Sequence, residues 1–484
     1  MQHKQHKNFW QQKRRMAMNL LYLNTHDIGR YLNIYGYDVE TPNLNQLAKD
    51  GMLLRNMHCA SPTCSPSRAV LLTGQYPHNN GLTGLAHRGF DITDKKTHLA
   101  AFLRQQGYET VLAGVQHEIR TRSESELGYE KVLNGEAYYQ KGIRQEEFLT
   151  MQDEMATEAA VVYLQSRKTT DRPFYLAVGY GCTHREYPDL PQEYNCSYIM
   201  PPKGVPDQAG SRQDMARLKI ALERMDRYCG KIIETLKAIG EYENTVIVFT
   251  TDHGLPIPKA KCTLYDDGTG VAMIIKAPGI TKPCQSSDAL LSQIDFYPTL
   301  CEILSLPQPE WLQGVSFLPV LNQTSSEVRN EIYGEINYHI ACEPVRSVRT
   351  SRYKYIRHYL AEYPYQIPCH IDDSEPKEIF HQAGIFEQKL PMEELYDLVG
   401  DPQERNNLAE CPEYQKQKNE MQNLLLDWQV KTGDPLLETG TVCLPAGAIA
   451  STPDSYSTKT QVILPECRQY LGALKEVLQN NIKG

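Results

Sequence analysis

The sequence predicts an α/β protein with a large, mostly parallel sheet flanked by helices and a smaller C-terminal α+β domain that carries an antiparallel sheet. Two observations lead to this fold class. Short apolar segments alternate with longer amphipathic segments through most of the chain, which is typical of a parallel sheet covered on both faces. After about residue 335 the alternation stops. We therefore expect one domain over residues 18–335 and a second over residues 336–484.

The elements of the first domain follow from their apolar patterns and their end signals. Continuous apolar or β-branched segments predict strands, and helical periodicity between capping residues predicts helices. The expected strands are 18–23, 108–114, 173–180, 246–251 and 270–279. The expected helices are 41–51, 97–107, 211–240 and 292–306.

The second domain has a different pattern. Residues 345–359 are typical of a β-hairpin with its turn near Thr350 and Ser351. A strand is expected at the start of 394–410, one helix over 413–434 and a last helix near 464–480. This order predicts a small antiparallel domain packed on the first.

Composition limits the classes of function. The 484 residues are 41% hydrophobic and 23% charged, which is ordinary for a globular protein with room for two domains. The net charge is −9 and the only basic run is 13–15, so we expect no nucleic-acid partner. An anionic substrate would need a locally positive pocket.

The sequence gives little indication of a membrane helix, a secretion signal or a disulfide framework. No segment approaches the roughly 18 apolar residues of a membrane helix, so we expect no membrane partner. Residues 1–27 lack the apolar core and cleavage site of a secretion signal, so we expect a cytoplasmic protein. Thirteen cysteines without C-x-x-C spacing argue against a zinc ribbon and a disulfide framework.

Polar side chains gather just after two of the expected strands. His26 and Asp27 follow the first strand, and Asp252 and His253 follow the strand 246–251. Ligands of parallel sheets bind at this edge, and carboxylates with imidazoles suit a divalent cation. Each pair alone could equally be a helix cap or a turn.

The segment "CSPSRAVLLTG", residues 64–74, carries the most specific signal. It fits C-x-P-S-R-x-x-x-L-T-G and resembles the signature of the type I sulfatases of the alkaline-phosphatase superfamily. The alternative, a buried cysteine before a helix with a chance proline and arginine, is disfavoured by the number of matched positions. The resemblance implies an alkaline-phosphatase-like fold.

The resemblance also implies a chemistry. A maturation enzyme would oxidise Cys64 to Cα-formylglycine, whose hydrate offers one hydroxyl to attack sulfur and a second to expel sulfate. Pro66 suits a helix start, where free N–H groups favour an anion. Arg68, one turn later, can hold the diol and the sulfate oxygens.

Downstream segments resemble one branch of the family. "TDHGLPIPKAKCTLYDDGT" (251–269), "ELYDLVGDPQERNNLA" (394–409) and "WQVKTGDP" (428–435) look like the heparan N-sulfatases, or N-sulfoglucosamine sulfohydrolases. The block that ends at Lys261 and is followed by "LY" is more particular to this branch than the cysteine motif.

The resemblance assigns roles position by position. His117 would hydrogen-bond the diol, His184 would protonate the leaving group, and Lys261 would be the second basic ligand of the sulfate. The carried-over residues are Cys64, Arg68, His117, His184 and Lys261 as catalytic groups, and His26, Asp27, Cys64, Asp252 and His253 around the metal.

Two positions depart from the family pattern. The family usually has aspartate where His26 stands and lysine where Val115 stands. One negative and one positive group are therefore both absent. His26 could compensate either as a neutral metal ligand or, when protonated, as a cation.

We therefore expect a formylglycine-dependent sulfatase that acts on a sulfated sugar, with N-sulfoglucosamine of the heparan type as the favoured substrate. The resemblance implies Ca²⁺, and the histidines leave Mn²⁺ or Mg²⁺ open. A homodimer is also open. The alternatives are an O-sulfatase on another glycan, a phosphonate or phosphodiester hydrolase, and a weakly catalytic binder of sulfated glycans.

Overall fold

A computed structural model describes residues 17–139, 142, 144–168, 172–361, 363–440 and 442–459. Its larger sheet has eight strands in the order β5-β4-β6-β1-β7-β8-β2-β9. The strands of this sheet are β1 (Asn19–Thr25), β2 (Met52–Leu54), β4 (Glu109–Gly114), β5 (Lys131–Val132), β6 (Phe174–Gly179), β7 (Thr245–Thr251), β8 (Met273–Lys276) and β9 (Gln285–Ser287). The last helix expected from the sequence, near 464–480, lies outside the described residues.

The central strands β4, β6, β1 and β7 run parallel to one another, which confirms the expected mostly parallel sheet. β8 is the exception, because it pairs antiparallel with both β7 and β2. A short pair, β3 (Met57–His58) with β10 (Leu291–Ser292), lies apart from this sheet.

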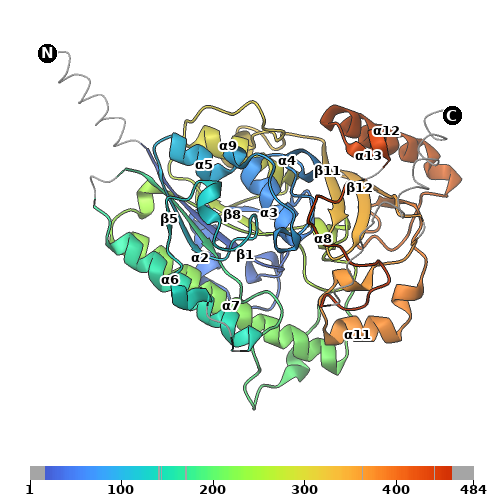
Figure 1. Ribbon diagram of the computed structural model, residues 1–484, viewed down its shortest axis with the longest axis horizontal. Helices are drawn as coiled ribbons and strands as arrows, with labels where there is room; N and C mark the ends of the chain where they lie inside the picture. The colour runs from blue at the N-terminus through green and yellow to red at the C-terminus, as the bar shows by residue number, and fades with distance from the viewer. Residues whose placement is uncertain are drawn as a thin grey trace.

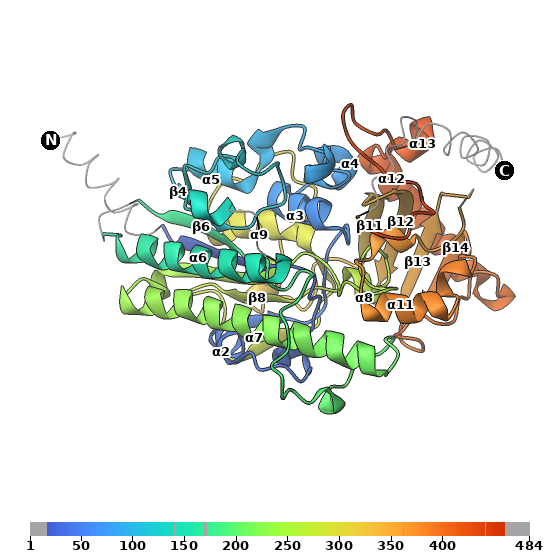
Figure 2. The ribbon, with the colours of Figure 1, turned by 60° about the horizontal axis from the view of Figure 1, so that its bottom comes forward.

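Helices cover both faces of the sheet, as Figures 1 and 2 show. α2, α6 and α7 lie on one face, and α3, α5 and α9 lie on the other. The helices of this part are α2 (Pro42–Asp50), α3 (Cys64–Thr73), α4 (Pro77–Asn80), α5 (Leu99–Gln105), α6 (Gln145–Gln165), α7 (Ala209–Ala238), α8 (Asp266–Thr269), α9 (Phe296–Ile303) and α10 (Leu318–Leu321).

The two apolar layers follow from the alternation of side chains along each strand. In β1, Leu20 and Tyr22 pack with α3, α5 and α9, whereas Leu21 and Leu23 pack with α2, α6 and α7. Because β1 is buried on both faces, its central residues 20–23 form a continuous apolar segment, and this is the signal that identifies it.

The C-terminal part contains a four-stranded antiparallel sheet, which confirms the second element of the predicted fold class. Its elements are β11 (Glu331–Tyr338), β12 (Cys342–Thr350), β13 (Tyr353–His358), β14 (Glu393–Asp397), α11 (Glu375–Gln382), α12 (Gln415–Thr432) and α13 (Pro435–Thr439). The hairpin of β12 and β13 pairs Arg349 with Lys354, at the expected turn. The predicted domain boundary at 335/336 falls inside β11.

The chain beyond α12 returns to the larger part of the molecule. Leu436, Val442 and Ala450 belong to the apolar layer that contains α3, α5 and α9. Within the part of the chain that the structure describes, no helix is long and apolar enough to cross a membrane.

Candidate active site

Four neighbouring parallel strands deliver polar side chains to one edge of the sheet. His117 follows β4, His184 follows β6, Asp27 follows β1 and Asp252 follows β7. Since the C-terminal ends of these strands meet at the same edge, the topology alone places these residues around one space. The structure therefore brings together residues that are far apart in the sequence.

The buried helix α3 points its first residue, Cys64, into this space. Cys64 Sγ lies 3.4 Å from His253 Nε2. All ten residues of α3 are buried, and the helix is held against the end of β7 by Ser67, whose hydroxyl donates to the carbonyl of Asp252. Burial raises the pKa of the Cys64 thiol well above its ordinary range. The unmodified side chain is therefore a neutral thiol at physiological pH.

Arg68 and Asp252 form a buried ion pair in the site. Arg68 Nη2 donates to the carbonyl of Thr25 at 3.1 Å, and its Nε and Nη2 both lie 3.3 Å from Asp252 Oδ2. Asp252 Oδ1 accepts the backbone N–H groups of Asp27 and His253, each at 2.9 Å. Although burial opposes the charged form, His253 and Arg68 hold the pKa of Asp252 well below its usual range.

One cluster has the composition of a cation site. Ligand atoms of His26, Asp27, Cys64 and Asp252 all lie within 4.8 Å of one another. Asp27 Oδ1 is buried and accepts no hydrogen bond from the described residues, although it lies 3.2 Å from His253 Nε2. The left-handed backbone of Asp27, with φ of 55°, turns this residue out of β1. Carboxylates with imidazoles and an oxygen left without a partner fit a divalent cation.

His26 occupies the space between the site histidines. Its ring lies 4.8 Å from that of His117 and 5.5 Å from that of His184, and its Nδ1 is 3.2 Å from Asp252 Oδ2. Burial, with the nearby Arg68 cation, lowers the pKa of His26 to about 4. A neutral imidazole at neutral pH agrees with the metal-ligand role and disfavours the alternative role as a cation.

Lys261 meets two carboxylates, one of which the sequence did not single out. Its Nζ donates to Asp27 Oδ2 and to Asp372 Oδ2, both at 2.9 Å. Asp372 comes from the C-terminal part, just before α11, so both parts of the chain build this site. In the sequence Asp372 stands beside Asp373, and no local signal separates the two.

An open cleft of about 960 Å³ leads away from the histidines. His26, His117 and His184 line its inner end, together with Val115. Its other lining side chains include His87, Arg122, Tyr138, Tyr139 and Phe148. Aromatic side chains with a few polar groups around a cleft are typical of a binding site for a small molecule.

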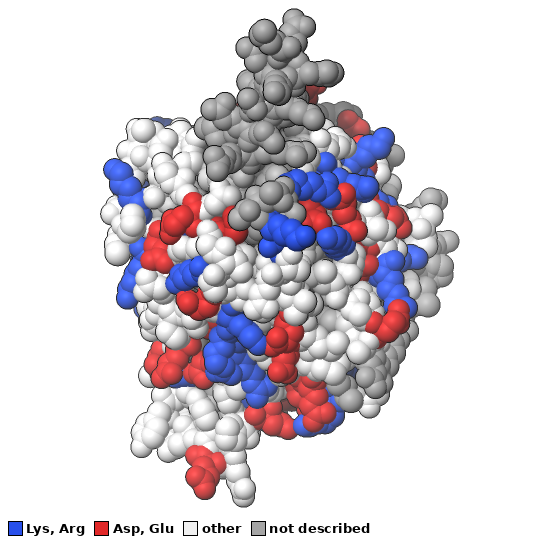
Figure 3. All heavy atoms as spheres, turned by 90° about the vertical axis from the view of Figure 1, so that its left-hand side faces the viewer, with Lys and Arg blue, Asp and Glu red and all other residues white. Residues whose placement is uncertain are grey.

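The face of the molecule in Figure 3 has no large patch of charged side chains of one sign. Lys and Arg side chains are interspersed there with Asp and Glu. An anionic substrate therefore gains no long-range attraction from this face. Inside the site, Arg68 and Lys261 supply positive charge.

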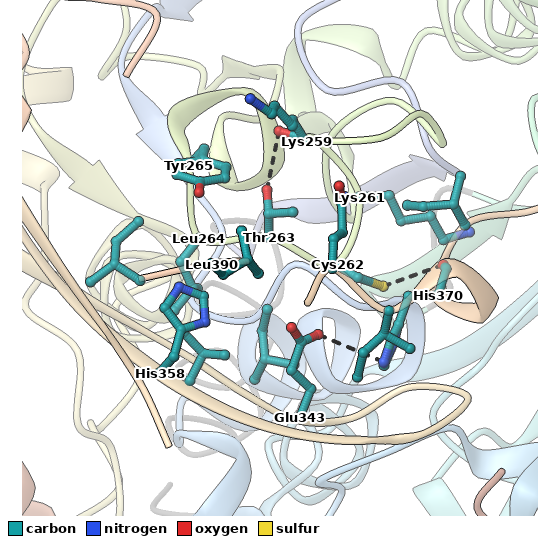
Figure 4. A pocket seen from close by; sticks show the side chains of 16 residues that line it. Lys259, Lys261, Cys262, Thr263, Leu264, Tyr265, Glu343, His358, His370 and Leu390 are labelled. Carbon is teal, nitrogen blue, oxygen red and sulfur yellow. Dashed lines mark hydrogen bonds and ion pairs between the residues drawn. The ribbon is translucent and has the colours of Figure 1, made fainter. Parts of the chain in front are cut away.

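A small closed cavity lies behind Lys261, between its loop and the antiparallel sheet (Figure 4). Glu343 points toward His370 across this cavity, with Oε2 3.7 Å from Nε2. Both ring nitrogens of His370 lack hydrogen-bond partners among the described residues. Burial raises the pKa of Glu343 to about 7. Polar groups of this kind are usually satisfied by buried water.

Comparisons with known proteins identify the family of the chain. The chain matches the sulfatase family over residues 19–306 and the C-terminal domain of N-sulphoglucosamine sulphohydrolase over residues 259–385. An ulvan-active sulfatase of Formosa agariphila is 31% identical over 86% of this chain and 79% of its own. The human N-sulphoglucosamine sulphohydrolase is 27% identical over 85% of this chain and 88% of its own.

Among solved structures, a 2-O glycosaminoglycan sulfatase superposes with a TM-score of 0.67 at 21% identity. The superposition covers 91% of this chain and 98% of the other. At this level of identity the likeness concerns the fold.

Proposed function

Because the chain belongs to the sulfatase family and is an enzyme of that class, we propose that it is a formylglycine-dependent sulfatase that removes an N-sulfate from a glucosamine residue. The observation that carries the proposal is the position of Cys64. It is the first residue of a buried helix, and its Sγ lies within 4.8 Å of ligand atoms of His26, Asp27 and Asp252. Such a helix end favours an anion.

Modification of Cys64 is supported by the state of its side chain. A thiol whose pKa is raised by burial is a weak nucleophile, because the thiolate is the reactive form. The formylglycine hydrate would supply the hydroxyl that attacks sulfur. The proposal therefore includes a maturation enzyme as a partner.

The other side chains divide the remaining work. Arg68 and Lys261 bind the oxygens of the sulfate. Their ion pairs, with Asp252 and Asp27 respectively, hold both cations in place before the substrate binds. His184 protonates the leaving nitrogen or oxygen through Nε2. Its Nδ1 is 2.5 Å from the carbonyl of Arg185, which orients the ring with Nε2 toward Asp27.

A divalent cation would be held by His26, Asp27, Asp252 and His253 beside residue 64. When bound, it would stabilise negative charge on the attacking oxygen and on the sulfate. We propose Ca²⁺ from the resemblance. Mn²⁺ is the alternative that the imidazoles favour.

Two classes of substrate are considered for this sulfatase. The match to the C-terminal domain of N-sulphoglucosamine sulphohydrolase supports the N-sulfate. The higher identity of the ulvan-active sulfatase supports another glycan as the substrate. We expect release of sulfate from N-sulfoglucosamine by matured enzyme. If the enzyme releases sulfate only from O-sulfated glycans, the substrate assignment changes to that class. If it releases sulfate from neither class, the proposed function is wrong.

A further inference from the structure

We propose that Asp372 is a specificity-determining residue that makes the site accept monoanions and reject dianions of the same shape. This inference rests on the proposed function for the place of the anion. It adds a basis for discriminating a sulfate ester or a sulfamate, each with one negative charge, from a phosphate monoester with two.

The position of Asp372 is the first argument. One of its oxygens accepts from Lys261 Nζ at 2.9 Å, so it lies directly on the cation that would bind the anion. Ligand atoms of Asp372, Asp27 and His184 are also within 4.8 Å of one another. Asp372 therefore faces the space between the metal side and the proton donor, and 18% of its side chain is exposed.

The charge of the site is the second argument. Lys261 Nζ lies 2.9 Å from a carboxylate oxygen of Asp27 and 2.9 Å from one of Asp372, so this cation is already paired with two carboxylates. Asp27, Asp252 and Asp372 supply three negative charges, against two positive charges from the two cations. The Asp372 carboxylate therefore reduces by one the positive charge that is available to a bound anion.

Without Asp372, one more positive charge would face the bound anion, and this favours a dianion over a monoanion. A carboxylate beside the anion costs a dianion more than a monoanion, because the repulsion scales with the ligand's charge. For an extra charge a few ångströms from the carboxylate, this difference corresponds to about tenfold to a hundredfold in relative affinity.

A pair of unreactive ligands tests the proposal. Methanesulfonate is a monoanion, methylphosphonate at alkaline pH is a dianion of nearly the same shape, and neither has an ester bond to hydrolyse. Their Kd values would be measured by titration calorimetry on the Ca²⁺-loaded full-length protein, with and without Asp372→Asn. The matched control is Asp373→Asn, the adjacent carboxylate, which pairs with Lys377 outside the site.

We expect Asp372→Asn to lower the Kd of methylphosphonate relative to the Kd of methanesulfonate by about tenfold or more. Asp373→Asn should leave the ratio of the two Kd values unchanged. An equal change for both ligands, or no change, would show that Asp372 only positions Lys261 and would overturn the proposal. If Asp372→Asn does not fold, Asp372→Ser is judged by the same ratio. Because binding is read without turnover, absence of sulfatase activity in the wild type would refute the proposed function separately.

Discussion

Asp153 on α6 holds the segment that carries His184, and replacing it should damage proton donation selectively. The carboxylate is fully buried and accepts the N–H of Gly181 at 2.7 Å and the N–H of Cys182 at 2.8 Å. The N–H of His184 then bonds to the carbonyl of Gly181 at 2.9 Å. Asp153 is therefore a positioning residue, because it acts on the reaction only through His184.

The size of the effect follows from these contacts. In Asp153→Asn one carboxylate oxygen becomes an NH₂ group, so one buried N–H loses its acceptor, at a cost of about 1–3 kcal/mol. If the segment shifts to relieve this cost, the rate with a poor leaving group falls about ten- to a hundredfold. An activated aryl sulfate, whose leaving group needs no proton, should lose much less.

The assay compares kcat/KM on a sulfated sugar and on nitrophenyl sulfate for the wild type and the variant. Glu154→Gln, at the exposed neighbouring position of α6, is the control and should change neither value. Equal losses on both substrates would assign Asp153 to general stability. No loss on the sugar would refute its role in placing His184.

Three further predictions concern the metal side, the fold and the closed cavity. His26→Ala should weaken cation affinity about ten- to a hundredfold, with excess cation restoring part of the activity, and calorimetry that shows unchanged affinity would contradict the ligand role. Arg346→Met should lower the free energy of unfolding by about 3–5 kcal/mol, because Arg346 is fully buried and its Nε lies 2.7 Å from Asp434 and 3.8 Å from Glu335. Urea denaturation measures this, and a loss below about 1 kcal/mol would refute the buried-charge argument. Burial raises the pKa of Glu343 to about 7, so its contribution to stability is present below its ordinary pKa and is lost as pH rises through about 7. Glu343→Gln should therefore gain in Tm over the wild type between about pH 5 and about pH 8, whereas a constant difference would be inconsistent with the raised pKa.

The sequence was sufficient for the elements whose pattern is strong. β1 and β7 are buried on both faces and have continuous apolar centres, and α7 has a regular apolar stripe. The parallel order of these strands predicts that Asp27 and Asp252 lie together. The antiparallel direction of β8 has no signal in its own residues, because a buried strand is apolar in either direction.

The helix α6 was not predicted for a related reason. Its inward face includes Gln152, Asp153 and Thr157, so the apolar stripe that marks a helix is interrupted. Gln152 and Asp153 face inward because they bond to other segments: Gln152 donates to the carbonyl of Tyr138, and Asp153 accepts the N–H groups of Gly181 and Cys182. The hydroxyl of Thr157 donates within the helix, to the carbonyl of Asp153. Asp372 is not predicted for the same reason. Its place in the site depends on its contact with Lys261, which lies more than a hundred positions away in the chain. Tertiary contacts of this kind cannot be read from a local pattern.

The central claim is that residue 64 must be converted from cysteine to formylglycine for the enzyme to work. The direct test prepares the protein with different extents of conversion, measured by mass spectrometry of the peptide spanning Cys64, and records the rate of sulfate release for each preparation. We expect a rate of sulfate release that is proportional to the converted fraction, with no release at zero conversion. Full activity in protein that retains an unmodified Cys64 would contradict it.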